Sequence, residues 1–436
     1  SEQMHLMLRE RQKISHRQMR FVTNFRRPAM WWKPRKTARE CVAVSFDLLM
    51  SNAEKSVREP LPRGFWVIWS TVALDMVGFG IVVPILGRYA DRYGASGFQV
   101  GLLFASFSLA QMVFSPILGR WSDKVGRKPV IVISLIGTAV GSFITGAAGA
   151  LWVLFAGRLI DGASGASVSV AQSAVTDLGA PQQRARMLGL LGMAFGVGFV
   201  VGPALGGLAA LGGPHVPFYV AGVLASINAV AAIIRLPETK KVRVEQPVVA
   251  HVPRQRNITS FVLIGFFSVL PFAGFEATFS LFGGNRFNLT EASTAGVFLV
   301  VGLLMAAVQG ALIGPLTEKF GSLALMRTGQ VLVALGMLFL GAAVIWPVLI
   351  VALVLMVIGA GIASPSLTTL VANSAPESMR GEVLGFQQSS NALARVVGPP
   401  LAGLAFDHIG VGAPFTLGAG IYLVAIVIAS RRSLRH

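Results

Sequence analysis

Apolar runs about as long as a membrane is thick recur along this chain and limit what it can fold into. Crossing a hydrocarbon core takes about 20 predominantly apolar residues in one helix. A soluble helical protein shows amphipathic stripes and roughly a quarter charged residues, whereas this sequence is 54% hydrophobic and 13% charged. The alternating ten-residue segments of barrel strands are absent. We therefore expect an all-α integral membrane protein with twelve transmembrane helices, at 65–86, 98–118, 129–149, 151–172, 188–211, 216–236, 258–282, 293–316, 323–343, 346–370, 383–406 and 411–430.

The basic residues predict the orientation of these spans. If both termini are cytoplasmic, the outer loops hold only Arg88, Arg92 and Arg286 of the 37 Lys and Arg residues. Nearly all the others fall in inner loops and tails, as positively charged cytoplasmic loops require. The net charge of +18 is therefore attributed to membrane topology, and no nucleic-acid partner is expected. We expect a multi-pass protein of the plasma (inner) membrane.

The two halves of the sequence resemble each other, which predicts two pseudo-symmetric six-helix bundles. GRWSDKVG at Gly119–Gly126 returns as GPLTEKFG at Gly314–Gly321, and GPALGG at Gly202–Gly207 returns as GPPLAG at Gly398–Gly403, at nearly the same spacing. Secondary transporters are often built from such repeats around a central site. The expected organisation is a basic N-terminal tail at 1–63 with a possible native start at Met50, bundles at 64–236 and 258–430, a cytoplasmic linker at 237–257, and a C-terminus at 431–436.

The stretch GRWSDKVGRK between the second and third spans carries five charges in ten residues and is predicted to be a short inner loop. Its glycines would allow tight turns, and its aspartate can pair with a neighbouring arginine or face a helix end. It is either a conformational latch or only a positive topology signal. The residues concerned are Gly119, Asp123, Lys124, Gly126, Arg127 and Lys128.

A glycine stripe marks the fifth span, where Gly198, Gly202 and Gly206 recur every four residues beside Pro203 and Gly207. Glycines at this spacing let another helix approach closely, and a proline frees a backbone carbonyl. The stripe is consistent both with a pliable seam and with plain tight packing.

Ionisable residues inside the predicted spans are the main candidates for function, because burying charge in a bilayer is costly. Arg158 and Asp161 lie three residues apart and can form either a structural ion pair or a proton-transfer pair. Asp75 and Glu276 have no opposite charge nearby in sequence, so each could bind a proton or a cationic substrate. Arg395 is the fifth ionisable residue inside the predicted spans that we consider a candidate. Uncharged polar residues that could line a cavity or bridge helices are Gln111, Gln172, Gln309, Gln387 and Asn391.

Several of these stretches resemble motifs of the major facilitator superfamily. GRWSDKVGRK is similar to its loop signature, and LFAGRLIDGASG to its Arg-bearing motif in the fourth span. GFVVGPALGG, LDMVGFGIVVPIL and RLPET resemble the drug–proton antiporter branch, in particular tetracycline-efflux proteins. The resemblance covers about residues 64 to 430. It implies that Asp123 and Arg127 act as a latch favouring an outward-facing shape, and that Arg158 takes part in proton transfer.

The resemblance implies a proton-coupled antiporter that exports small amphipathic or drug-like molecules by alternating access. The ninth span, 323–343, contains no acid, which departs from the tetracycline pumps. The alternatives are a proton symporter or uniporter for a sugar or organic anion, favoured by Arg395, and a non-transporting sensor. No nucleotide-binding or enzyme motif is present, and the histidines are too scattered for a metal site. We expect no enzyme activity and no cofactor beyond the proton gradient, with protons, a small-molecule substrate and lipid as partners of a monomer.

Overall fold

The computed structural model describes residues 60–62, 64–165, 167–178, 181–239, 256–375 and 380–430. Most of the expected N-terminal tail with Met50, most of the linker and the C-terminus after Ser430 lie outside these residues. Within the described part, every regular element is a helix and no strand occurs, which confirms the all-α class.

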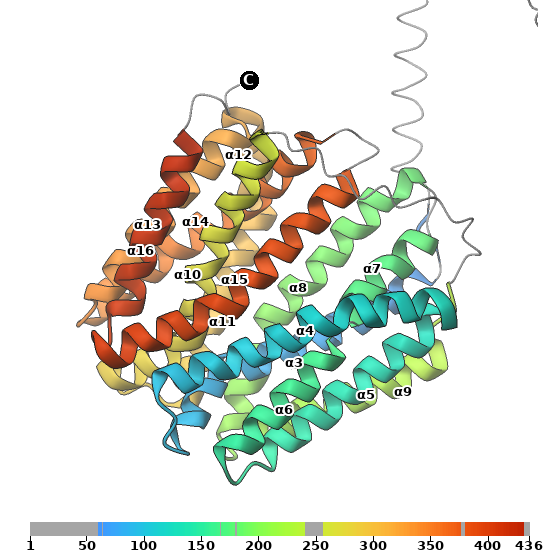
Figure 1. Cartoon of the computed structure of the whole chain (residues 1–436), viewed down its shortest axis with the longest axis horizontal. Helices are drawn as coiled ribbons and strands as arrows, with labels where there is room; N and C mark the ends of the chain where they lie inside the picture. Colours follow the sequence, from blue (N-terminus) through green and yellow to red (C-terminus); the bar gives the residue numbers. More distant parts are fainter. Residues whose placement is uncertain are drawn as a thin grey trace, which may run out of the picture. The chain divides into compact units, whose positions relative to one another are not determined.

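Seven helices of the first half lie among the described residues, and the second half follows after the linker. Helices of the first half, coloured blue to green, lie on one side in Figure 1, and those of the second half, yellow to red, lie on the other. The first-half helices are α3 (Phe65–Asp91), α4 (Gly97–Val125), α5 (Arg127–Gly146), α6 (Leu151–Ser164), α7 (Ser167–Leu178), α8 (Pro181–Ala210) and α9 (Val216–Arg235). The second-half elements are α10 (Arg256–Phe287), α11 (Glu291–Ala307), the π-helix η1 (Val308–Leu312), α12 (Ile313–Phe320), α13 (Ser322–Ala342), α14 (Trp346–Asn373), α15 (Arg380–His408) and α16 (Ala413–Ser430).

Ten helical spans among the described residues are long and apolar enough to cross a membrane. The other two predicted spans are not among these ten, because one is too short as a continuous helix and the other is too polar. The span at 151–172 is divided into α6 and α7 by a break at Gly165, and the span at 383–406 is α15, which carries Arg395 and several amides. Many helices extend beyond the predicted bounds, because their polar ends stay helical past the apolar run.

Local sequence signals explain several helix starts. Ser96 caps α4 and Thr290 caps α11, each by a capping box in which side chain and backbone bond reciprocally three residues apart. Proline lies in the first turn of α9 and of α14, where its missing N–H is not needed. These caps fix where chain segments re-enter the membrane.

The predicted repeat is visible in equivalent turns of the two halves. Gly126 ends α4 with a positive φ of 111°, and Gly321 ends α12 with a positive φ of 77°. The N–H of Gly126 donates to the Ser122 carbonyl, and that of Gly321 donates to the Thr317 carbonyl. A side chain would be strained at either position. We call the end of the molecule that carries these two turns the loop end, and the opposite end the far end.

The GRWSDKVGRK stretch is not the ten-residue loop predicted. Helix α4 runs on to Val125 and α5 begins at Arg127, so Gly126 alone makes the turn. The prediction that Gly119 also forms a turn is wrong, because Gly119 lies inside α4. Charged residues can continue a helix once it has left the apolar layer, so polarity alone did not mark its end.

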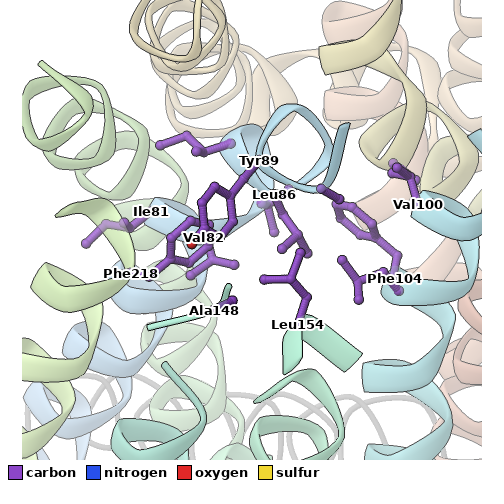
Figure 2. Close-up of a cluster of buried hydrophobic side chains, with 14 of the residues drawn as sticks. Ile81, Val82, Leu86, Tyr89, Val100, Phe104, Ala148, Leu154 and Phe218 are labelled. Atoms are coloured by element: carbon purple, nitrogen blue, oxygen red, sulfur yellow. The ribbon is translucent and has the colours of Figure 1, made fainter. Parts of the chain in front are cut away.

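Apolar clusters hold each half together, and one of them extends across both. Figure 2 shows this cluster, with Tyr89 of α3 beside Phe218 of α9, their ring centroids 4.6 Å apart. Ala277 and Leu281 of α10 belong to the same cluster. First-half and second-half helices therefore share one buried apolar core at this level.

Candidate functional site

A cavity of about 540 Å³ lies between the two halves, large enough for a drug-sized molecule. Its walls come from α3, α4, α5, α6, α7 and α8 in the first half and from α10 and α15 in the second. All five predicted ionisable residues border it: Asp75, Arg158, Asp161, Glu276 and Arg395. Residues far apart in the sequence are thus brought to one site.

Asp75 is a carboxylate with a neutral hydrogen-bond partner. The hydroxyl of Ser167 donates to its Oδ2 at 2.6 Å. Ser167 opens α7, directly after the break in the fourth span, so the break places a polar group against α3. In the described part of the chain, Asp75 makes no ion pair. This agrees with the prediction of an acid without an opposite charge.

Arg158 and Asp161 form the ion pair that their spacing predicted. Nη1 of Arg158 lies 2.9 Å from Oδ2 of Asp161, and the arginine side chain is only 3% exposed. Its guanidinium also lies over the ring of Phe107, 4.2 Å from the centroid, a favourable cation–π position. Arg158 is thereby held on two sides, although its Nε has no hydrogen-bond partner.

Glu276 is not the isolated acid that the sequence suggested. Nη1 of Arg395 lies 3.5 Å from Oε2 of Glu276, joining α15 to α10. The two residues are 119 positions apart, so sequence proximity could not reveal the pair. The glutamate side chain is 7% exposed, whereas that of Arg395 is 41% exposed.

The uncharged candidates divide into two groups. Gln111, Gln172 and Asn391 border the cavity. The side-chain amide of Gln111 donates to the Gly165 carbonyl at 2.9 Å and so satisfies a backbone group freed by the helix break. Gln309 is exposed in the π-helix, and Gln387 is buried; neither borders this cavity among its described lining residues.

Sequence reasoning missed part of the lining. On α15 the cavity is bordered by Gln388 and Ser389 rather than by Gln387, because neighbouring residues on a helix point about 100° apart. Five phenylalanines also border it, and among them the ring of Phe79 contacts those of Phe107 and Phe199. Their spacing in sequence gives no signal, since they lie on α3, α4 and α8.

The charged residues of the GRWSDKVGRK motif form a network centred on Arg127. Its guanidinium pairs with Asp123 at 2.8 Å and with Asp177 of α7 at 2.9 Å, and donates to Ser122 at 2.6 Å. Arg127 is buried, whereas Asp123 is half exposed. Of the alternatives left open for Asp123, the structure shows the pair with a neighbouring arginine, Arg127. Lys124 and Lys128 complete the motif on either side of the turn.

Glu238 of the RLPET stretch explains why that stretch accompanies the motif. Its carboxylate accepts the backbone N–H of Arg127 at 2.8 Å and that of Lys128 at 3.2 Å. These are the first N–H groups of α5, which have no intrahelical partner. An acid at a helix start is also favoured by the helix dipole. Glu238 therefore anchors the end of α9 to the start of α5.

The glycine stripe of α8 packs closely against α3. An added Cβ at Gly198 would lie 2.5 Å from Met76, and one at Gly202 would lie 2.6 Å from the Cα of Gly80. Gly206 faces Ile81 in the same way, with Pro203 inside the helix. Gly207 instead faces Ala295 of α11 in the second half. The predicted close helix approach is confirmed.

Polar contacts join the two halves at the far end. The carboxylate of Asp407 on α15 accepts the backbone N–H of Gly97 at 2.7 Å and that of Phe98 at 2.8 Å, at the start of α4. Arg92 after α3 pairs with Glu291 of α11 at 2.7 Å. We call the Asp407 contact the α4–α15 clamp.

Close contacts between helix backbones also lie near the far end. Near the far end of α4, an added Cβ at Gly101 would overlap the Pro399 carbonyl, and Gly403 of α15 touches Gly97. Towards the loop end, Gly119 of α4 and Gly192 of α8 have nothing within 4 Å of an added Cβ. The contacts between the halves named here therefore lie at the far end, whereas these two glycines towards the loop end face open space.

Comparison with known proteins identifies the family. The family model described as the Major Facilitator Superfamily matches residues 68–313 and 303–434. The chain belongs to the Major Facilitator Superfamily.

Relatives within the superfamily are named for drug resistance. The class B tetracycline resistance protein of Escherichia coli is 30% identical over 375 residues, covering 82% of this chain and 92% of that protein. Multidrug resistance protein 2 of Bacillus subtilis (strain 168) is 26% identical over 378 residues, covering 83% and 93%.

A solved structure is also similar to this chain. The human organic anion transporter MFSD10 (TETRAN) matches with a TM-score of 0.66 and 26% identity, covering 85% of this chain and all of that chain. The protein is a multi-pass membrane transporter with the superfamily fold, and a small molecule is its substrate.

Proposed function

We propose that this transporter is a proton-coupled antiporter that exports small amphipathic, drug-like molecules by alternating access. The observation that carries the proposal is Asp75, a carboxylate that borders a central cavity and makes no ion pair with any residue that the structure describes. Such a group can hold either a proton or a cationic substrate, but not both. The drug-resistance names of the relatives support export.

The coupling follows from competition at that carboxylate. A proton that enters from outside displaces the cation, and a cation that enters from inside displaces the proton. The membrane potential supplies about 2.3 kcal/mol per elementary charge per 100 mV. The neighbouring Arg158–Asp161 pair would pass protons towards Asp75, since all three residues border one cavity. No bound cofactor is needed for this cycle.

The direction of transport rests on the proposed orientation. Because the basic loops favour a cytoplasmic loop end, the end at which Gly119 and Gly192 face open space would face the cytoplasm. The structure would then be an inward-facing state of a plasma-membrane protein, with both termini cytoplasmic. In this state Asp123 pairs within its own half, with Arg127, which is compatible with an outward-state latch that is released.

The test uses proteoliposomes that contain the purified protein, a pH-sensitive dye and an imposed proton gradient. Cationic dyes, antibiotics and sugars are added in turn to the wild type, to Asp75→Asn and to the control Asp91→Asn, an exposed aspartate at the end of the same helix. We expect drug-evoked proton movement in the wild type and in the control, and none in Asp75→Asn. Proton movement with a sugar or organic acid but with no drug would overturn the proposal.

That second outcome would favour a carrier of organic anions. Arg395 borders the cavity with a partly exposed guanidinium, and the human relative is named as an organic anion transporter. Tetracycline, for which the Escherichia coli relative is named, is not proposed as the substrate. Helix α13, which is the predicted ninth span, contains no carboxylate.

A further inference from the structure

One face of α15 forms, together with α10, the second-half wall of the cavity, and Arg395 is the charged residue on this face of α15. Gln388, Asn391, Ala392, Arg395 and Pro399 all border the cavity, at the spacing of three and four residues that defines one helix face. Among the described residues, no other side chain of this face carries a charge.

The contact with Glu276 uses only part of the N–H donors of the Arg395 guanidinium. A guanidinium carries five N–H donors, and the contact to Glu276, from Nη1 at 3.5 Å, is long for a charged hydrogen bond. The side chain is 41% exposed, and none of its nitrogens is among the buried atoms without a partner. Glu276 can therefore hold one edge while another edge stays accessible from the cavity.

Arg158 shows what an inaccessible arginine looks like in the same cavity. Its side chain is 3% exposed, its ion pair is 2.9 Å long, and Phe107 covers its guanidinium. Arg395 has the longer pair and more than ten times the exposed fraction. The two arginines thus differ in what they offer a ligand, and only Arg395 is free to bind an anion bidentately.

The cavity therefore presents, on the first half, a carboxylate that makes no ion pair with a described residue and, on the second half, a partly accessible guanidinium. Asp75 of α3 can receive a cation, and Arg395 of α15 can receive an anion, in a cavity that phenylalanines of α3, α4 and α8 also line. A purely cationic molecule would leave the exposed guanidinium without a ligand. A molecule that carries both charges on an apolar body would satisfy both groups.

We propose that the transported substrates are zwitterionic amphipathic molecules, whose carboxylate binds Arg395 while their ammonium group faces Asp75. This rests on the proposed function in that it takes the cavity as the transport site. It makes Arg395 a specificity-determining residue.

The test uses two fluorescent probes that differ only in the carboxylate. Nε-dansyl-lysine carries an α-ammonium and a carboxylate, and dansylcadaverine is the same molecule without the carboxylate. Binding is measured by fluorescence titration of the purified full chain. Dansyl-aminohexanoic acid, which keeps a carboxylate and lacks the amine, is the third probe.

We expect the wild type to bind Nε-dansyl-lysine about tenfold or more tightly than dansylcadaverine, as a charge-assisted bidentate contact implies. Arg395→Gln should remove that preference without weakening dansylcadaverine. Arg395→Lys should restore it in part, since it keeps the charge but loses the fork. Glu276→Gln should retain or increase the preference.

Three outcomes would overturn the proposal: no binding of Nε-dansyl-lysine to the wild type, no preference for it over dansylcadaverine, or a preference that survives in Arg395→Gln. If Arg395→Gln fails to fold, the other two variants decide. A preference that is undiminished in Arg395→Lys, or one that is lost in Glu276→Gln, would then overturn the proposal. A preference that depends on Arg395, together with absent proton movement in proteoliposomes, would reject antiport and leave the zwitterion site standing.

Discussion

Replacing Asp407 with asparagine tests whether the α4–α15 clamp holds the far end shut. In the structure the two carboxylate oxygens accept the N–H groups of Gly97 and Phe98, at 2.7 and 2.8 Å. Asparagine keeps one acceptor and turns the other into an NH₂ group that would face a backbone N–H. The substitution also removes a negative charge from the start of α4, where the helix dipole favours it.

The size of the effect follows from these losses. A hydrogen bond to a charged group contributes about 1.5–3 kcal/mol to stability. Because Asp407 is exposed, we take the lower part of that range, about 1.5–2 kcal/mol, which is a factor of roughly 10 to 30 in an equilibrium constant. This free energy acts on the equilibrium between conformations, since the clamp joins two halves and can form only when the far end is closed.

The assay is a distance measurement between spin labels at the far end. Leu211 after α8 and Ile409 after α15 are 75% and 70% exposed, and each would carry a label on cysteine in a Cys41→Ser background. Asp407→Asn should raise the population of long distances, whereas Asp91→Asn should leave it unchanged. An unchanged distribution in Asp407→Asn, in a protein that remains folded, would refute the clamp.

Three further substitutions test the packing and the helix ends. Gly202→Ala should lower the thermal unfolding temperature, because its Cβ would meet the backbone of α3 at 2.6 Å and overpacking costs about 1–3 kcal/mol; Gly192→Ala, with open space around it, should have no such effect, and equal effects would contradict the argument. Glu238→Gln should cost about 1 kcal/mol of stability through the weakened α5 cap, while the exposed Glu318→Gln serves as its control in the same thermal scan. Arg92→Gln should change the spin-label distances less than Asp407→Asn does, because the Arg92 side chain is 51% exposed and an ion pair at the surface contributes about 0–1 kcal/mol; a shift as large as that of Asp407→Asn would show that this estimate is too low for a pair whose acid, Glu291, is largely buried.

The sequence by itself determined the membrane class, the approximate positions of the spans and the repeat. Each depends on local properties that a one-dimensional pattern carries. Apolar length sets the spans, and the repeated Gly-x-x-x-Asp/Glu-Lys-x-Gly pattern led directly to the equivalent turns at Gly126 and Gly321. The pairings at short separation, Arg158 with Asp161 and Arg127 with Asp123, were predictable because helix geometry alone brings residues three or four apart together.

Tertiary structure alone decided which distant residues meet. The pairing of Glu276 with Arg395, the clamp from Asp407 to the start of α4, and the capping of α5 by Glu238 all depend on which helices pack and how each is rotated. A rotation of about 100° per residue separates Gln388, which borders the cavity, from Gln387, which does not. Hydropathy places a residue at a depth in the membrane, whereas its partner is fixed by packing between helices, and that information is not contained in any single span.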